Sequence, residues 1–308
     1  MKYLRKFETE AEYNAYPIVV PFVGLINDSK KVVYVPRMLP LHFIALEDTT
    51  ISFSLNTVQY SFDNKEWSTL SPGTKTRTIE AGEVIYFKAS GLTPVAVNGI
   101  GTFTITGKCD VAGSVLSMLY GDNFEESANI TLPNYAFRKL FVSSSNLRDA
   151  SRLILPSINL SYQCYNVMFY QSGITAAPKL PAGTMASECY KSMFQDCANL
   201  QDAPALPAMT LADSCYRAIF AGTGIKSVVL PATKLVTNCY NEMFQRCSAI
   251  SYVKMMAIDW NPIMHSNQWM TSVTVTNGTF VKNSAATWTE TFDANAIPDG
   301  WTVETADK

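Results

Sequence analysis

The chain has 308 residues, enough for one large domain or for two to three ordinary ones. Apolar residues make up 47% of it and charged residues 16%, a balance that excludes disorder over the whole length. The net charge of −2 argues against a protein that acts by neutralising nucleic-acid phosphates. With only two histidines, His42 and His265, the composition favours a binding or scaffold protein over an enzyme or a metalloprotein.

The N-terminal residues contain no apolar run of the length found in secretory signals, because charged residues from Arg5 to Glu12 interrupt it. No run of 18 apolar residues occurs anywhere, so we expect no membrane-spanning segment. The seven cysteines are an odd number and include no C-x-x-C pair. We therefore expect synthesis in the cytoplasm with reduced cysteines, and neither a disulfide framework nor a zinc site.

Residues 1–38 are interpreted as an attachment segment that contains a hairpin. Val19 to Ile26 and Val32 to Val35 are predicted strands, joined by a turn at Asn27-Asp28-Ser29. The apolar residues of this segment are too many to remain in water and too few to fold alone. The expected attachment residues are Leu4, Phe7, Tyr13, Tyr16, Val19, Val20 and Phe22.

Residues 39–108 change to a period of two, in which Ile51, Phe53 and Leu55 alternate with polar residues. Turn sequences recur about every ten residues, at Asp63-Asn64, Ser71-Pro72-Gly73 and Ala81-Gly82. This spacing predicts a small antiparallel β-sandwich-like domain. Trp67 belongs either to its core or to a sugar-binding surface.

Residues 109–258 contain an internal repeat. CYNVMF, CYKSMF, CYRAIF and CYNEMF begin at Cys164, Cys189, Cys215 and Cys239, and a fifth, degenerate copy includes Ala136-Phe137. The apolar positions i, i+4, i+5, i+8 and i+9 predict one face of a helix, and the prolines that follow predict an extended half. One short helix and one extended segment in each repeat are typical of a leucine-rich-repeat solenoid. The expected fold is mixed α and β, with about five repeats and a C-terminal cap at 259–308.

The repeated cysteines have a structural explanation in this frame. Ala136 occupies the slot that holds cysteine in the other copies, so the slot requires a small apolar side chain. Cys197 and Cys247 occupy a second slot, where other copies carry Ser172 and Thr223. We expect buried thiols and no cofactor or metal; a metal or redox role is the alternative.

The repeat resembles the BspA-like leucine-rich repeats of surface-associated proteins from gut bacteria and their phages. The segments Gly113 to Phe124 and Gly278 to Glu304 resemble the caps of that family. Residues 1–38 are similar to the opening segments of virion proteins in crAss-like tailed phages, through F-x-T/E-x-x-x-Y followed by P-x-V-x-L-I-x-D. The resemblance implies surface recognition rather than catalysis.

Candidate ligand-binding residues follow from the L-x-x-A-x-x-L frame, whose variable positions point outward from the extended segments. The predicted residues are Arg148, Asp149, Gln201, Asp202, Lys226 and Ser227. The alternative interpretations are a merely solvated surface and a site in the aromatic cap around Trp260, Trp269 and Trp288. No catalytic motif is present; Asp110, Asp122, Glu125 and Glu126 form either a glycosidase acid pair or a solvated rim.

Together with the absence of a signal peptide, these two resemblances imply a phage virion protein, a head fibre or tail-associated fibre located in the virion. The expected partners are capsid or tail proteins at residues 1–38, and a host or gut glycan or protein at the solenoid. We also expect a homo-oligomer that binds neither nucleic acid nor membrane. The alternatives are a bacterial BspA-like adhesin and a glycan depolymerase.

Overall fold

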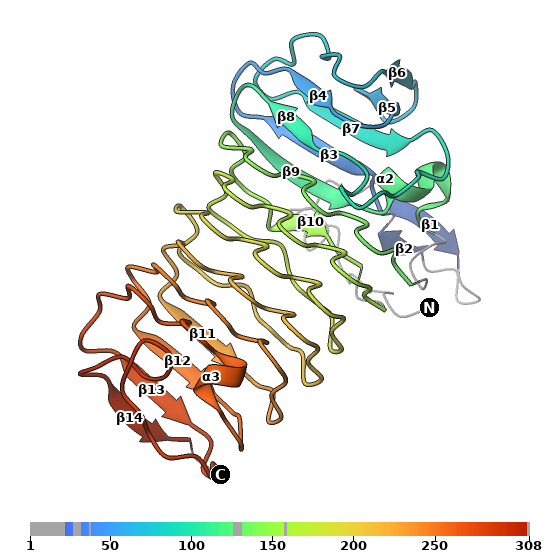
Figure 1. Cartoon of the computed structure of the whole chain (residues 1–308). Helices are drawn as coiled ribbons and strands as arrows, with labels where there is room; N and C mark the ends of the chain where they lie inside the picture. Colours follow the sequence, from blue (N-terminus) through green and yellow to red (C-terminus); the bar gives the residue numbers. More distant parts are fainter. Residues whose placement is uncertain (1–21, 27–31, 37, 126–130, 157–158, 307–308) are drawn as a thin grey trace. The chain divides into compact units, whose positions relative to one another are not determined.

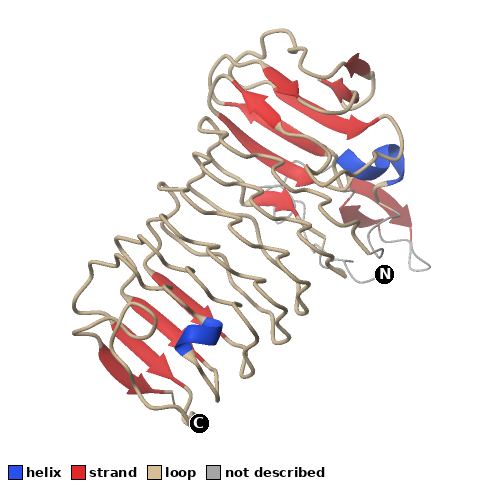
Figure 2. Ribbon diagram, viewed as in Figure 1, coloured by secondary structure: helices blue, strands red, loops and turns tan. Residues whose placement is uncertain are grey.

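The computed structural model describes residues 22–26, 32–36, 38–125, 131–156 and 159–306. The chain divides into two compact units, Met1–Leu39 and Pro40–Lys308. The structure is mostly β (Figure 2), and the helices in its described part are α2 (Ser117–Tyr120), the 3-10 helix η1 (Gly121–Asn123) and α3 (Pro262–His265). No helix in the described ranges is long and apolar enough to cross a membrane.

In the first unit, β1 (Phe22–Ile26) pairs antiparallel with β2 (Val32–Pro36). Phe22 lies opposite Pro36, and Ile26 lies opposite Val32. The predicted hairpin is therefore confirmed over these residues. Its turn and the predicted attachment residues Leu4, Phe7, Tyr13, Tyr16, Val19 and Val20 lie outside the described residues, and Phe22 is the first residue of β1.

The second unit begins with a six-stranded sheet and a two-stranded sheet. The strand order in the larger sheet is β10-β9-β3-β7-β5-β6, and β4 pairs with β8. Phe43, Phe53 and Phe87 surround Phe103, with ring centroids 4.7 to 5.1 Å from it. The strands are β3 (Leu41–Ala45), β4 (Ile51–Phe53), β5 (Val58–Ser61), β6 (Ser68–Leu70), β7 (Val84–Ala89), β8 (Phe103–Ile105), β9 (Cys109–Ser114) and β10 (Arg152–Ile154).

Strand β9 joins the β-domain to the repeats. It pairs antiparallel with β3 and parallel with β10, so one sheet runs from the predicted β-domain into the first repeat. The predicted boundary between residues 108 and 109 therefore falls inside a continuous sheet. The antiparallel pairing of β3, β7, β5 and β6 agrees with the expected β-domain.

The repeats form a solenoid whose coils stack side by side (Figure 1). Its best-formed face is a four-stranded parallel sheet near the C-terminal end, in the order β11-β12-β13-β14. In this register Val229 lies opposite Lys254, Lys254 opposite Val281, and Val281 opposite Glu304. The strands are β11 (Ser227–Leu230), β12 (Tyr252–Met255), β13 (Thr279–Lys282) and β14 (Thr302–Thr305).

The C-Y-x-x-M-F segments are consecutive turns, and the prediction of a helix in each repeat is wrong. In the coil that contains Cys189, every fourth residue has positive φ, namely Glu188, Ser192 and Asp196. Alternate N–H groups bond within the coil, as from Met193 to the Tyr190 carbonyl, and to the next coil, as from Phe194 to the carbonyl of Ile219. An α-helix would use nearly all of these donors internally. The solenoid wall instead bonds each coil to its neighbour.

Two columns of stacked aromatic rings fill the solenoid. Neighbouring rings are 5.5 to 6.3 Å apart in the first column and 5.1 to 6.4 Å apart in the second. Such spacing is typical of favourable aromatic pairs. The first column contains Phe137, Tyr165, Tyr190, Tyr216 and Tyr240, and the second contains Phe141, Phe169, Phe194, Phe220 and Phe244.

All seven cysteines are buried free thiols; burial is the predicted outcome for the six in the two repeat slots, and the seventh, Cys109, lies in β9. The Cys197 and Cys247 thiols donate to the carbonyls of Phe169 and Phe220, each over 2.9 Å. Burial raises the pKa of Cys197 to about 11. In the described ranges no group of His, Cys, Asp and Glu side chains is arranged to hold a metal ion.

The C-terminal tryptophans form a core instead of an exposed aromatic platform. Trp260 contacts Trp269 and Trp288 with ring centroids 5.5 and 4.9 Å apart, and Trp269 is completely buried. Their indole N–H groups bond to Ser266, Ala296 and Ala257 respectively. The alternative ligand site predicted around these three residues is therefore largely occupied by the cap's own packing.

Candidate functional site: a groove beside strand β11

The groove originates in a one-residue difference between adjacent coils. Leu200 and Ile225 are 25 positions apart, whereas Leu206 and Leu230 are 24 apart, so the earlier coil has one residue more on this face. Pro204 and Pro207 also lie in that coil and lack an N–H donor. The extra residue and the prolines prevent residues 203–207 from continuing the parallel ladder beside β11.

The backbone of β11 has one paired edge and one free edge. The carbonyls of Lys226 and Leu230 accept from Tyr252 and Met256, on the β12 side. The N–H and C=O groups of successive residues in a strand point to opposite edges. Those of Ser227 and Val229 therefore point away from β12 and toward residues 203–207. Within the described residues 201–208 and 226–231, no backbone hydrogen bond crosses between these two segments.

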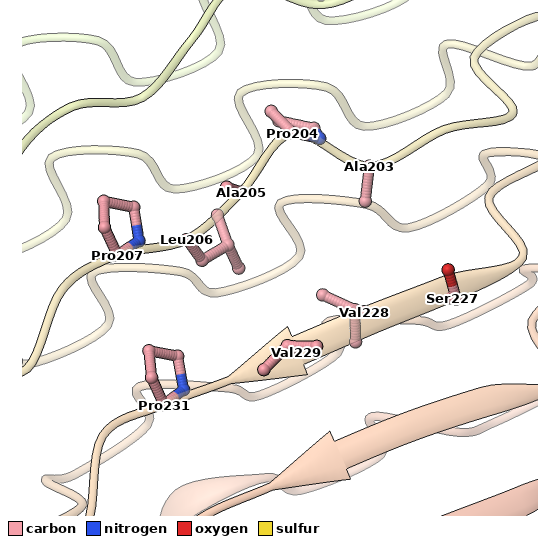
Figure 3. Close-up of a pocket in the computed structure, with 9 residues that line it drawn as sticks. All are labelled: Ala203, Pro204, Ala205, Leu206, Pro207, Ser227, Val228, Val229 and Pro231. Carbon is pink, nitrogen blue, oxygen red and sulfur yellow. The ribbon is translucent and has the colours of Figure 1, made fainter.

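The gap between these segments is a groove with a volume of about 330 Å³. This size is near the lower limit for small-ligand pockets. Figure 3 shows the two walls, with residues 203–207 on one side and β11, followed by Pro231, on the other. The lining is mostly aliphatic and consists of Ala203, Pro204, Ala205, Leu206, Pro207, Ser227, Val228, Val229 and Pro231.

Four of the six predicted ligand residues meet at one end of this groove. Ser227 lines it, and Lys226 precedes Ser227 in the chain. Gln201 and Asp202 immediately precede the opposite wall, and the Lys226 Nζ donates to Gln201 Oε1 over 3.2 Å. All four side chains are exposed. The structure therefore brings together the predicted pairs from two neighbouring coils.

The other two predicted ligand residues lie two coils away and have structural contacts. The Arg148 guanidinium donates to the backbone carbonyls of Ser145, Leu147 and Gly173. The Asp149 carboxylate accepts from the Ser151 N–H over 2.7 Å, which closes a turn. These contacts hold the chain between two coils, so the predicted set does not form a single site.

The groove is flanked by two lysines that the sequence did not lead us to predict as ligand-binding residues. Lys254 lies directly opposite Val229 on the neighbouring strand. Lys179 is 26 positions before Ala205, the same offset that pairs Thr184 with Thr210 in these coils. Each lysine immediately precedes the last apolar residue of the extended segment in its coil, Leu180 or Met255. The lysines at this position are visible in the sequence, but the L-x-x-A-x-x-L frame did not predict it as part of the ligand-binding surface.

The acidic residues considered as a glycosidase pair have separate partners. Asp110 forms an ion pair with Arg152, and Asp122 forms one with Lys88. Glu125 is also engaged in an interaction, and Glu126 lies outside the described residues. Asp110 and Asp122 therefore pair with different basic residues, Arg152 and Lys88.

Trp67, considered as either core or sugar-binding, is half-buried. The buried Lys88 places its Nζ 4.1 Å from the Trp67 ring centroid while pairing with Asp122. This contact covers ring surface that a sugar would need.

Comparisons with protein families, with curated proteins and with solved structures find no match to this chain.

Proposed function

We propose that this chain is a structural protein of a phage virion, a head fibre or tail-associated fibre, that presents a BspA-type leucine-rich-repeat solenoid for recognition of host or gut surfaces. The observation that carries the recognition role is the gathering of Gln201, Asp202, Lys226 and Ser227 at one end of the groove. These residues differ between coils, whereas the stacked core around them repeats. Variable polar residues on a regular apolar frame suit recognition.

The virion location is supported by the resemblance of residues 1–38 to phage virion proteins. The division of the chain after Leu39 is compatible with a separate attachment element. In this proposal residues 1–38 bind capsid or tail proteins, the protein is made in the host cytoplasm, and its copies form a homo-oligomer. A bacterial adhesin of the same repeat type is the rival; it would be found on cells and not on particles.

Purified phage particles test the attachment role. The full chain should co-sediment with particles, whereas a chain lacking residues 1–38 should remain soluble and folded but no longer co-sediment. Co-sedimentation of the truncated chain would contradict this proposal.

The recognition role is tested by the double substitution Asp202→Ala and Lys226→Ala. Both side chains are exposed, so the free energy of unfolding should change by less than about 0.5 kcal/mol. Adsorption to host cells should weaken. Unchanged adsorption with unchanged folding would exclude this end of the groove as the recognition site.

A further inference from the structure

The free edge of β11 supplies paired backbone donors and acceptors at an aliphatic surface. Ser227 and Val229 direct their N–H and C=O groups away from β12, and Val229 is 50% exposed. An exposed strand edge beside apolar pockets is a typical docking site for an extended peptide, whose backbone continues the ladder. The groove lies along this edge (Figure 3).

The charges around the groove are unequal. The four coil segments 176–182, 201–207, 226–231 and 251–257 contain three lysines, Lys179, Lys226 and Lys254, and one acid, Asp202. Within the described structure none of these three lysines forms an ion pair. Glu304 lies in the same cross-strand row as Lys254, two strands further on. The chain as a whole has a net charge of −2, so positive charge is concentrated at this site.

We propose that the groove binds an extended, acidic peptide segment of a partner protein, which pairs with the free edge of β11. This inference rests on the proposed recognition function and specifies its ligand class. A carboxylate placed in the row of Ala205 and Val229 lies between the strand positions of Lys179 and Lys254. Opposite charges at such a rim favour the correct partner and register.

The lining favours a peptide over a glycan. The walls consist of alanine, proline, leucine and valine, with Ser227 as the polar side chain, and they contain no aromatic ring on which a sugar could stack. The polar groups of the groove are largely those of a strand backbone, which match the backbone of another strand. An anionic glycan would use the lysines but not the strand edge.

Fluorescence anisotropy with the full chain tests the proposal. The probe is a short fluorescein-labelled peptide in which Glu and Val alternate. Its binding should weaken about tenfold in Val229→Pro, which removes the edge N–H and leaves the β12 side of the strand paired. Val229→Thr keeps the N–H and should bind within about twofold of the parent. Circular dichroism checks that both variants fold.

The charge contribution is tested separately with Lys179→Gln and Lys254→Gln combined. This variant should bind the peptide more weakly and with a smaller dependence on salt. Lys234→Gln is the matched control, because Lys234 is exposed but lies outside the four coil segments. The same peptide with Lys in place of Glu should not bind.

A second comparison uses only the parent protein, so it holds even if Val229→Pro does not fold. Methylation of alternate backbone nitrogens of the peptide should abolish binding, and oligogalacturonate should compete poorly. Failure of the acidic peptide to bind, or equal binding of its methylated form, would overturn the inference. The two proposals can fail separately. If the peptide does not bind but adsorption to host cells still depends on Asp202 and Lys226, the peptide inference is wrong and the proposed recognition function stands. If the peptide binds but adsorption does not depend on these two residues, the peptide site stands and the proposed recognition function is wrong.

Discussion

Asp196 and Arg246 form an ion pair across an intervening coil, with Asp196 Oδ1 and Arg246 Nη2 2.9 Å apart although 50 residues separate them. Gly222 lies between them, at φ 70°, in the slot that its neighbours fill with these two charged residues. A Cβ on Gly222 would lie 2.3 Å from Asp196 Oδ1. The absence of a side chain in one coil therefore lets the two adjoining coils interact directly.

Replacing Gly222 with Ala should destabilise the protein by about 1–2 kcal/mol, because the new methyl group displaces the carboxylate and the backbone has positive φ. The free energy of unfolding from urea denaturation measures the effect. Gly183→Ala is the control, since a Cβ there meets nothing within 4 Å and the φ is not positive. Equal stability of the two variants would contradict the steric explanation.

Serine should be accepted at one cysteine slot and rejected at the other. Cys197→Ser can keep the hydrogen bond to the Phe169 carbonyl and should cost less than about 1 kcal/mol. The Cys215 thiol is completely buried and, unlike that of Cys197, donates to no backbone carbonyl within the described part of the chain, so placing the more polar serine hydroxyl there should cost about 2 kcal/mol. Cys215→Ala should cost about 1 kcal/mol, since Ala136 occupies the equivalent position. Equal losses in both serine variants, measured by urea denaturation, would refute the distinction.

The buried thiols predict a loss of stability at alkaline pH. Burial raises the pKa of Cys197 and Cys247 to about 11, and that of Cys164 and Cys239 to about 12, above the ordinary value near 9. Above pH 9 the unfolded chain releases these protons while the folded chain retains them, so the free energy of unfolding must fall as pH rises. Each thiol should contribute about 1.4 kcal/mol per pH unit between its two pKa values.

This decline should begin near pH 9 and be absent between pH 7 and 8, as measured by urea denaturation. Cys197→Ala combined with Cys247→Ala should make the slope shallower, because two of the groups that titrate near pH 11 are removed. An unchanged slope would show that other groups, such as the buried tyrosines, dominate.

Tyr190→Phe should stabilise the protein by about 1 kcal/mol. The Tyr190 hydroxyl is buried and has no hydrogen-bond partner among the described residues, and Phe137 already occupies the same column. Removing an unpaired buried hydroxyl removes its desolvation penalty. Tyr162→Phe is the control, because the Tyr162 hydroxyl accepts from Gln163 Nε2 over 2.9 Å. A lower melting temperature for Tyr190→Phe would contradict this prediction.

The sequence by itself determined the repeat, the residues that fill its interior and the hairpin of the first unit. Cys164 and its equivalents recur at the coil length, and every coil must bury the same slots to stack on its neighbours. The hairpin strands were visible because β-branched residues flank a strong turn sequence. The repeat and the hairpin can be recognised from the residues of a single continuous segment, without knowing which other segments lie beside it.

The tertiary structure decided whether the apolar pattern forms helices or turns. Over nine residues a period of four differs from the helical 3.6 by only about 0.8 residue, so spacing alone did not separate them. The choice is made by hydrogen bonds such as that from Phe194 to Ile219, which exist only once two coils are adjacent. The groove has the same origin: the additional residue between Leu200 and Leu206 matters because β11 lies beside it, and only that adjacency places Lys254 at its rim.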